Sequence, residues 1–176
     1  MPITVTTPSD REVLVVREFN APRQLVFDAH MKPELVKRWC YGYEGWSMPV
    51  CEIDARVGGR YRYRWRNDAD GSEFGFTGEF KEIVEPSKIV HSEFFDPGTL
   101  EDSPDSPTAT AARSFPTDEQ GSLITNTLTE KSGKTTLTVR MLFPSKEARD
   151  GAVATGMTDG METSYQRIDA MFADAA

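Results

Sequence analysis

The spacing of apolar residues along this chain changes from a period of two to a helical period near the carboxyl end. From Trp46 to Phe143, apolar and polar residues alternate, which is typical of strands with one buried face. From Met157 onward, the mainly apolar residues of one stripe recur at steps of three and four, which places them on one side of a helix. This helical stripe consists of Met157, Met161, Ser164, Tyr165, Ile168, Met171 and Phe172. Such a helix needs a surface to pack against, and we expect the strands to form that surface.

The alternating region and the segments before it predict a defined order of elements. Residues 1 to 10 are expected to be a loose lead-in, followed by a first strand. Two short helices come next, the first capped by Asn20 with Pro22 in its first turn, and the second broken from it at Pro33. Ser145 is expected to cap a short helix that a bend at Gly156 separates from the long one. The expected strands are 11–19, 48–54, 61–66, a strand from 73 with a bulge near 82, 88–95, 122–130 and 134–143.

This order predicts an α+β fold in which a curved antiparallel sheet holds the long terminal helix. The whole chain, residues 1–176, is expected to be one domain, because 176 residues bury a sizeable core without staples. Residues 96–120 are rich in Asp, Pro, Ser, Thr and Ala and are expected to form a flexible loop insertion.

The composition excludes several classes of partner. The net charge of −8 and the pI near 4.8 oppose binding to nucleic acid or to an anionic membrane, since both would repel the protein. No apolar run is long enough to span a bilayer, and the first ten residues lack the features of a secretory signal, so a cytoplasmic location is expected. Cys40 and Cys51 do not have metal-site or redox spacing, and neither a metal nor another cofactor is expected. A monomer or a weak homodimer is the expected state.

Aromatic residues on two neighbouring strands suggest either a ligand pocket or a packed core. In the segment RYRYRWR, Tyr61, Tyr63 and Trp65 share one face of a strand and the arginines share the other. The next strand continues this face with Phe74, Phe76 and Phe80. Opposite the methionines of the helix, such a face is typical of a pocket for a small ligand, and the tyrosine hydroxyls need partners or water. The arginine face is interpreted as a solvated surface with cross-strand ion pairs.

Few residues suggest catalysis. His91 and Glu93 lie two apart on one strand and are weak candidates for an acid–base pair, provided that their shared face is internal. Structural or surface roles are the favoured interpretation for His91 and for His30. None of the HExxH, GxSxG, P-loop or Cys–His motifs is present, so no catalytic residue is assigned.

The order of elements and several short segments resemble the SRPBCC superfamily, the helix-grip fold of START domains and of the birch-pollen allergen proteins. Within it, the chain resembles the branch named after activators of the heat-shock protein 90 ATPase. The resemblance extends from Arg11 to Phe172. Its segments are Asn20-Ala21-Pro22, Val26-Phe27-Asp28-Ala29, Pro33 to Trp39, Arg56 to Tyr61, Phe95-Asp96, Ser145 to Asp150, Gly156-Met157 and Gly160-Met161.

Two departures from that branch bear on its activity. Many relatives carry Trp-Trp-Gly-Pro where this chain has Trp39-Cys40-Tyr41-Gly42, so a contact made there is expected to differ. The co-chaperones that gave the branch its name also use a separate N-terminal domain, for which this chain has no room.

The resemblance implies a cavity between the sheet and the long helix that binds a small hydrophobic or aromatic molecule. Two alternatives stay open: a cyclase-like or dehydratase-like enzyme that uses the same cavity, and a chaperone-interacting module. Binding without catalysis is the leading hypothesis. The residues expected at the cavity are Tyr61, Tyr63, Trp65, Phe74, Phe76, Met157, Met161, Tyr165 and Ile168 on its wall, with Phe27 and Trp39 near its mouth.

Overall fold

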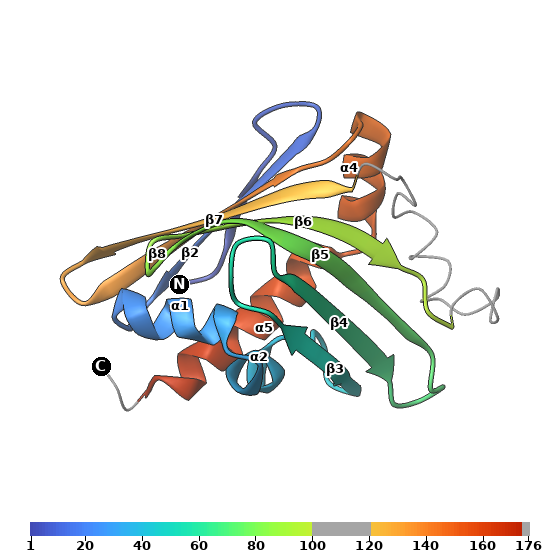
Figure 1. The fold of residues 1–176 in the computed structure, drawn as a ribbon, viewed down its shortest axis with the longest axis horizontal. Coiled ribbons are helices and arrows are strands. Elements are labelled where there is room, and N and C mark those ends of the chain that lie inside the picture. Colours follow the sequence, from blue (N-terminus) through green and yellow to red (C-terminus); the bar gives the residue numbers. More distant parts are fainter. Residues whose placement is uncertain (100–120, 174–176) are drawn as a thin grey trace.

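The computed structural model describes residues 1–99 and 121–173, and within them eight strands form one antiparallel sheet in the order β1-β2-β8-β7-β6-β5-β4-β3. Figure 1 shows the sheet curving around the terminal helix α5. The strands are β1 (Thr4–Thr6), β2 (Glu12–Phe19), β3 (Trp46–Ile53), β4 (Arg60–Asn67), β5 (Glu73–Val84), β6 (Lys88–Asp96), β7 (Ser122–Lys131) and β8 (Lys134–Leu142). The predicted α+β helix-grip fold is confirmed.

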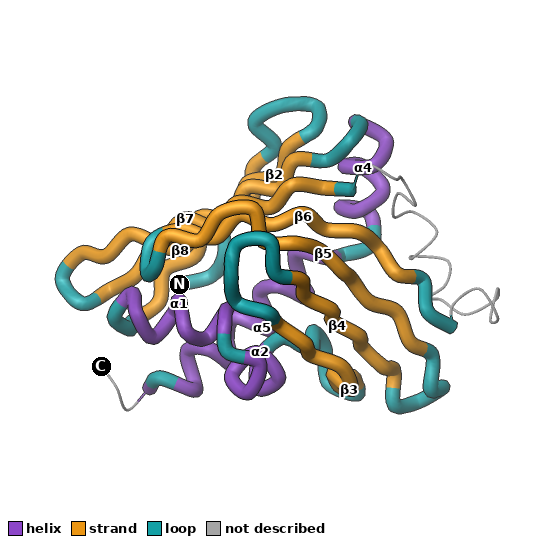
Figure 2. Tube along the Cα trace, in the orientation of Figure 1, coloured by secondary structure: helices purple, strands orange, loops and turns teal. Residues whose placement is uncertain are grey.

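Helices connect β2 to β3 and follow β8. Figure 2 shows α1, α2 and α5 gathered on one side of the sheet, which is its inner face. The helices of the described residues are α1 (Arg23–Met31), α2 (Pro33–Trp39), α4 (Lys146–Ala154) and α5 (Met157–Met171). Of the loop expected over 96–120, Asp96 ends β6, and residues 100–120 lie outside the described part of the chain.

Two predictions about the amino-terminal region were wrong. The expected loose lead-in contains β1, which pairs with β2 at the edge of the sheet. All three β1 side chains are exposed, so the strand has no apolar pattern by which to recognise it. Helix α1 begins after Pro22 rather than after Asn20, because the Pro22 carbonyl accepts from the amides of Leu25 and Val26.

The inner face is filled by packed side chains at one end of the sheet. Val13, Val15 and Leu137 on β2 and β8 are fully buried, as is Ile168 on α5. Buried apolar area is the main stabilising contribution here. The inner face of β4, β5 and β6 carries the aromatic residues instead, so the two halves of the sheet differ in what they hold.

A buried arginine ties α5 to β2. Arg17 is 2% exposed and points to the inner face, where its guanidinium pairs with Asp169 and lies 3.7 Å from a Glu162 carboxylate oxygen. A second hydrogen bond runs from Arg17 Nη1 to the Glu18 carbonyl at 2.7 Å. The cation has carboxylate partners on the helix, which a buried charge needs.

The bend between α4 and α5 occurs at Gly156, as predicted. Ser145 caps α4 by accepting from the Ala148 amide at 3.0 Å. Gly156 has φ +77° and ψ +21°, the left-handed conformation that glycine adopts without steric cost.

Replacing Gly156 by alanine is expected to lower the free energy of unfolding by about 1 kcal/mol, because alanine is strained at that φ. Gly160→Ala is the matched control within α5. An added Cβ at Gly160 would meet nothing nearer than Tyr43 Cε2 at 4.0 Å, and alanine favours the helix by about 0.5–1 kcal/mol. Urea denaturation of both variants checks this, and destabilisation of equal size at the two positions would contradict it.

Candidate functional site

A cavity of about 580 Å³ lies between the inner face of the sheet and helices α2 and α5. Nine of the eleven residues expected at the ligand site line this cavity. Phe27 and Ile168 do not, because both lie in the packed core at 4% and 0% exposure. The nine lining residues are Trp39, Tyr61, Tyr63, Trp65, Phe74, Phe76, Met157, Met161 and Tyr165.

The wall on the sheet side is a continuous series of aromatic rings. Tyr63 and Trp65 on β4 have ring centroids 6.0 Å apart, and Trp65 lies 5.7 Å from Phe76 on β5. The series reaches β6 through Phe95, which is 5.6 Å from Phe76. These distances are typical of favourable aromatic pairs. The alternation of the strands therefore delivers the rings to one surface.

The methionines of α5 and a loop complete the opposite wall. Met157 and Met161 are partly buried, and their flexible side chains adapt to irregular space. Tyr43 packs beside the α4–α5 bend, with its hydroxyl 3.4 Å from the Gly156 carbonyl oxygen. The Gly42 amide donates to Ser164 Oγ on α5 at 3.0 Å. The loop after α2 is thus attached to the helix at this side of the cavity.

His91 and Glu93 face the cavity, which answers a question that the sequence left open. His91 does not pair with Glu93, however: its Nδ1 lies 3.1 Å from the Tyr61 hydroxyl and 3.2 Å from the Ser92 carbonyl oxygen. The Tyr61 hydroxyl donates to the same carbonyl at 2.8 Å. Glu93 pairs with Ser122 through the strand backbones, but its carboxyl group has no hydrogen-bond partner among the described residues. The acid–base pair that would serve a cyclase or dehydratase is therefore not formed in this part of the chain.

A glycine opposite Tyr61 makes this arrangement possible. Gly78 on β5 pairs with Tyr61 in register. A Cβ at Gly78 would lie 1.9 Å from the Ser92 carbonyl oxygen and 2.5 Å from a Tyr61 ring carbon. The missing side chain lets the phenol lie across β5 and reach β6.

Burial sets the protonation of the polar groups in the cavity. It raises the pKa of Glu93 from 4.5 to about 7 and lowers the pKa of His91 from 6.5 to about 4. It also lowers the pKa of His30, whose Nδ1 lies 2.7 Å from the Val26 carbonyl oxygen and whose Nε2 is buried without a partner among the described residues. Both histidines are therefore neutral at pH 7.

The two cysteines are protonated structural thiols. Burial raises the pKa of Cys40 to about 12 and that of Cys51 to about 11. A thiol at such a pKa is a poor nucleophile at neutral pH. No group of three or more potential metal ligands occurs among residues 1–99 and 121–173.

The raised pKa of Glu93 is expected to make the free energy of unfolding depend on pH. Glu93→Gln should remove this dependence, because glutamine does not titrate. Because the folded pKa is raised, the folded state holds the proton up to a higher pH than the unfolded state. The contribution is fully present below pH 4.5 and is lost as the pH rises through about 7. Relative to wild type, the free energy of unfolding of Glu93→Gln should rise by on the order of 3 kcal/mol between pH 4.5 and pH 8.

Urea denaturation of both proteins at several pH values checks this prediction. His91 and His30 act in the opposite sense, because their lowered pKa values destabilise the fold as the pH falls below 6.5. They are present in both proteins and cancel in the comparison. A difference between the proteins that stays constant from pH 4.5 to pH 8 would contradict the prediction.

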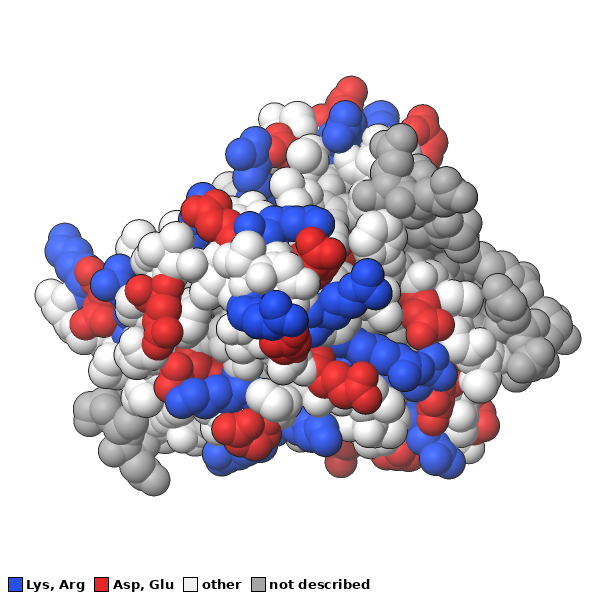
Figure 3. Space-filling view, viewed as in Figure 1, with Lys and Arg blue, Asp and Glu red and all other residues white. Residues whose placement is uncertain are grey.

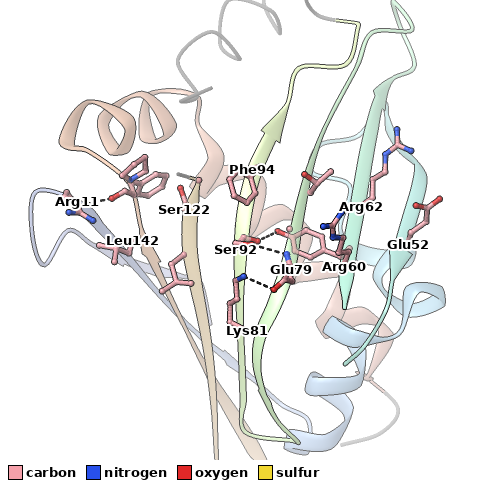
Figure 4. A pocket seen from close by; sticks show the side chains of 17 residues that line it. Arg11, Glu52, Arg60, Arg62, Glu79, Lys81, Ser92, Phe94, Ser122 and Leu142 are labelled. Carbon is pink, nitrogen blue, oxygen red and sulfur yellow. Dashed lines mark hydrogen bonds and ion pairs between the residues drawn. The ribbon is translucent and has the colours of Figure 1, made fainter. Parts of the chain in front are cut away.

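The outer face of the sheet has a second hollow, of about 920 Å³ over β5, β6 and β7 (Figure 4). It carries charges of both signs, among them the Lys81–Glu79 ion pair at 2.8 Å. The cross-strand ion pairs expected for the arginine face are formed by Arg64, which lies 3.5 Å from Glu73 and 2.7 Å from Asp96. Figure 3 shows basic and acidic side chains interspersed over this side of the molecule. No patch of a single sign is evident in that view.

Some residues of the cavity were missed in the sequence. Ile124 and Asn126 on β7 share the parity of the buried Leu128, so alternation alone carried a signal for them. Phe95 shares the parity of His91, whose face the sequence left open, so alternation gave no signal for it. His30 was missed although it lies in the last turn of α1, where its ring packs against Trp39 of α2 with a centroid distance of 4.9 Å. Contact between α1 and α2 is a tertiary feature, for which the sequence carries no periodic signal.

A curved antiparallel sheet with a long helix across its inner face, and a cavity between them, defines a helix-grip protein. Residues 20–173 match the family described as Activator of Hsp90 ATPase homolog 1-like protein, and the chain belongs to this family. No curated protein matches the chain significantly.

Solved structures share this fold. A Rhodobacter sphaeroides protein is 25% identical with a TM-score of 0.79, over 99% of each chain. A Mycobacterium smegmatis protein shares the fold at 23% identity and a TM-score of 0.77, over 99% of this chain and 100% of that one. A Plasmodium falciparum protein described as an HSP90 activator is 20% identical with a TM-score of 0.61, over 93% of this chain and 96% of that one. No helix of the described residues is long and apolar enough to cross a membrane.

Proposed function

We propose that this protein binds a small, mainly apolar molecule in the cavity between the sheet and α5. The observation that carries the proposal is the cavity itself, whose volume of about 580 Å³ lies within the usual range for ligand sites. Native cores contain few voids larger than a water molecule. The fully buried side chains of β2 and β8 show that this chain packs densely where no space is kept open.

The composition of the wall supports the same proposal. Aromatic and methionine side chains bury apolar ligands and adapt to their shape. Polar groups are few, and those of Tyr61 and His91 are held in fixed hydrogen bonds. An apolar pocket with a small number of placed polar groups is the usual form of a site for a small ligand.

Titration with N-phenyl-1-naphthylamine, a neutral probe that fluoresces in apolar surroundings, tests the proposal. Saturable fluorescence with one site per chain is the expected result. The native mass of protein purified from its own source, compared with the denatured mass, identifies a natural ligand that remains bound. Absence of saturable binding by this probe and by other apolar aromatics would overturn the proposal.

We infer a second candidate function, contact with a heat-shock protein 90 chaperone, from the family match over residues 20–173. The Plasmodium falciparum structure described as an HSP90 activator supports it by fold. The test is the ATPase rate of the chaperone from the same organism, with and without this protein. An unchanged rate, together with no co-elution at micromolar concentrations, would exclude this function.

We propose the cytoplasm as the location of the protein, and a monomer or weak homodimer as its state. Fractionation of the source cells tests the first proposal. Light scattering over a concentration series tests the second.

A further inference from the structure

We propose that the cavity binds an organic cation, an amine attached to an apolar or aromatic body, and that the Glu93 carboxylate is its counter-ion. This inference rests on the proposed function, because it names the chemical class of the ligand for the same cavity. It is carried by the charges that line the cavity, by the hydrogen bonds around Glu93 and by the aromatic wall.

The charged groups at the cavity have one sign. Among the described residues that line it, Glu93 is the only acidic residue, and there is no lysine or arginine. Arg167 on α5 is directed elsewhere: its Nη1 lies 3.3 Å from the Trp39 carbonyl oxygen, and its guanidinium carbon lies 3.7 Å from the Tyr41 ring centroid. His91 and His30 are neutral at pH 7, because burial lowers their pKa values. The described part of the chain thus supplies no cation for the Glu93 carboxylate.

Two polar side chains that share the cavity with Glu93, those of Tyr61 and His91, already take part in hydrogen bonds. The Tyr61 hydroxyl donates to the Ser92 carbonyl oxygen. His91 Nδ1 lies within hydrogen-bond distance of the Tyr61 hydroxyl oxygen and of the Ser92 carbonyl oxygen. Tyr63 and Cys40 are neutral, since burial raises the pKa of each. Glu93 is half-buried at the wall of a largely apolar cavity. A carboxylate in such surroundings is costly, and a bound ammonium group would pair with it through charge-assisted hydrogen bonds.

The aromatic wall favours the same class of ligand. Organic cations are attracted to the faces of tryptophan, tyrosine and phenylalanine rings within about 6 Å, more strongly where water is excluded. Tyr63, Trp65 and Phe76 form such a wall. Phe95 extends the wall onto β6, where it lies two positions after Glu93. An anionic ligand would be repelled by the carboxylate, while a neutral apolar ligand would leave it unpaired.

Three probes of nearly equal size separate a cationic, a neutral and an anionic ligand. They are 1-naphthylmethylamine, 1-naphthalenemethanol and 1-naphthoic acid. Each competes with N-phenyl-1-naphthylamine at pH 8. With wild type, the amine should displace the fluorophore at a concentration at least about tenfold lower than the alcohol, which corresponds to about 1.4 kcal/mol. The acid should be the weakest competitor. With Glu93→Gln, the advantage of the amine should disappear while the fluorophore still binds.

The matched control is Glu79→Gln, which removes a carboxylate from the outer face, where Glu79 pairs with Lys81. It should leave the order of the three probes unchanged. An amine without advantage, or an advantage that persists in Glu93→Gln, would overturn the inference while binding of the fluorophore upholds the proposed function. If neither the fluorophore nor any naphthalene binds to wild type, the proposed function itself fails.

Discussion

Filling the cavity with two tryptophans, Met157→Trp and Met161→Trp in one variant, is expected to weaken binding of N-phenyl-1-naphthylamine by about 30-fold. Both methionines line the cavity from α5. A buried aromatic group of 150–250 Å² contributes about 4–6 kcal/mol at 25 cal/mol per Å². Indoles that displace about one third of that contact cost about 2 kcal/mol, which is the 30-fold change. A fluorescence titration measures it.

Gln166→Trp is the control for this variant, because it places an indole on the exposed side of the same helix. Its affinity for the fluorophore should equal that of wild type. Circular dichroism and urea denaturation establish that both variants are folded. Unchanged affinity in the double variant, or an equal loss in Gln166→Trp, would show that the fluorophore binds elsewhere.

Ile168→Ala is expected to lower the free energy of unfolding by about 3 kcal/mol while leaving the affinity for the fluorophore within about twofold. Ile168 is fully buried in the core and does not line the cavity. Truncation there removes apolar contacts and leaves a void inside dense packing. Urea denaturation and the same fluorescence titration measure the two effects.

Met161→Ala is the matched variant on the same helix. Its effect on stability should be smaller than that of Ile168→Ala, and its effect on affinity should be larger. Met161 is only partly buried and borders open space, so its truncation should cost about 1 kcal/mol of stability. It should alter affinity, since Met161 lies at the ligand site. If Ile168→Ala weakened binding as strongly as Met161→Ala, the division between core and cavity would be wrong.

Much of the fold follows from local patterns in the sequence. Alternation in RYRYRWR places Tyr61, Tyr63 and Trp65 on the inner face, as the structure does. Steps of three and four place Met157 and Met161 on the inner side of α5. The bulge expected near residue 82 appears as a register shift between 80 and 82. Each of these features is set by residues close together in the chain.

The remainder depends on long-range packing. The helical stripe contains Ile168 and Met161 alike, and the period cannot show which of them meets packed side chains and which meets open space. Whether His91 and Glu93 point inward depends on how β6 pairs with β5 and β7. The position of Tyr61 depends on the missing side chain of Gly78 on the neighbouring strand. Patterns within one strand do not hold this information.

The measurement that tests the central claim most directly is methionine methyl NMR during titration with N-phenyl-1-naphthylamine. The chain has seven methionines, of which Met31, Met141, Met157 and Met161 line the cavity. We expect the methyl signals of these four to shift and saturate together, while those of Met1, Met48 and Met171 stay in place. Shifts confined to the latter three, or no shift at saturating probe, would contradict binding between the sheet and α5.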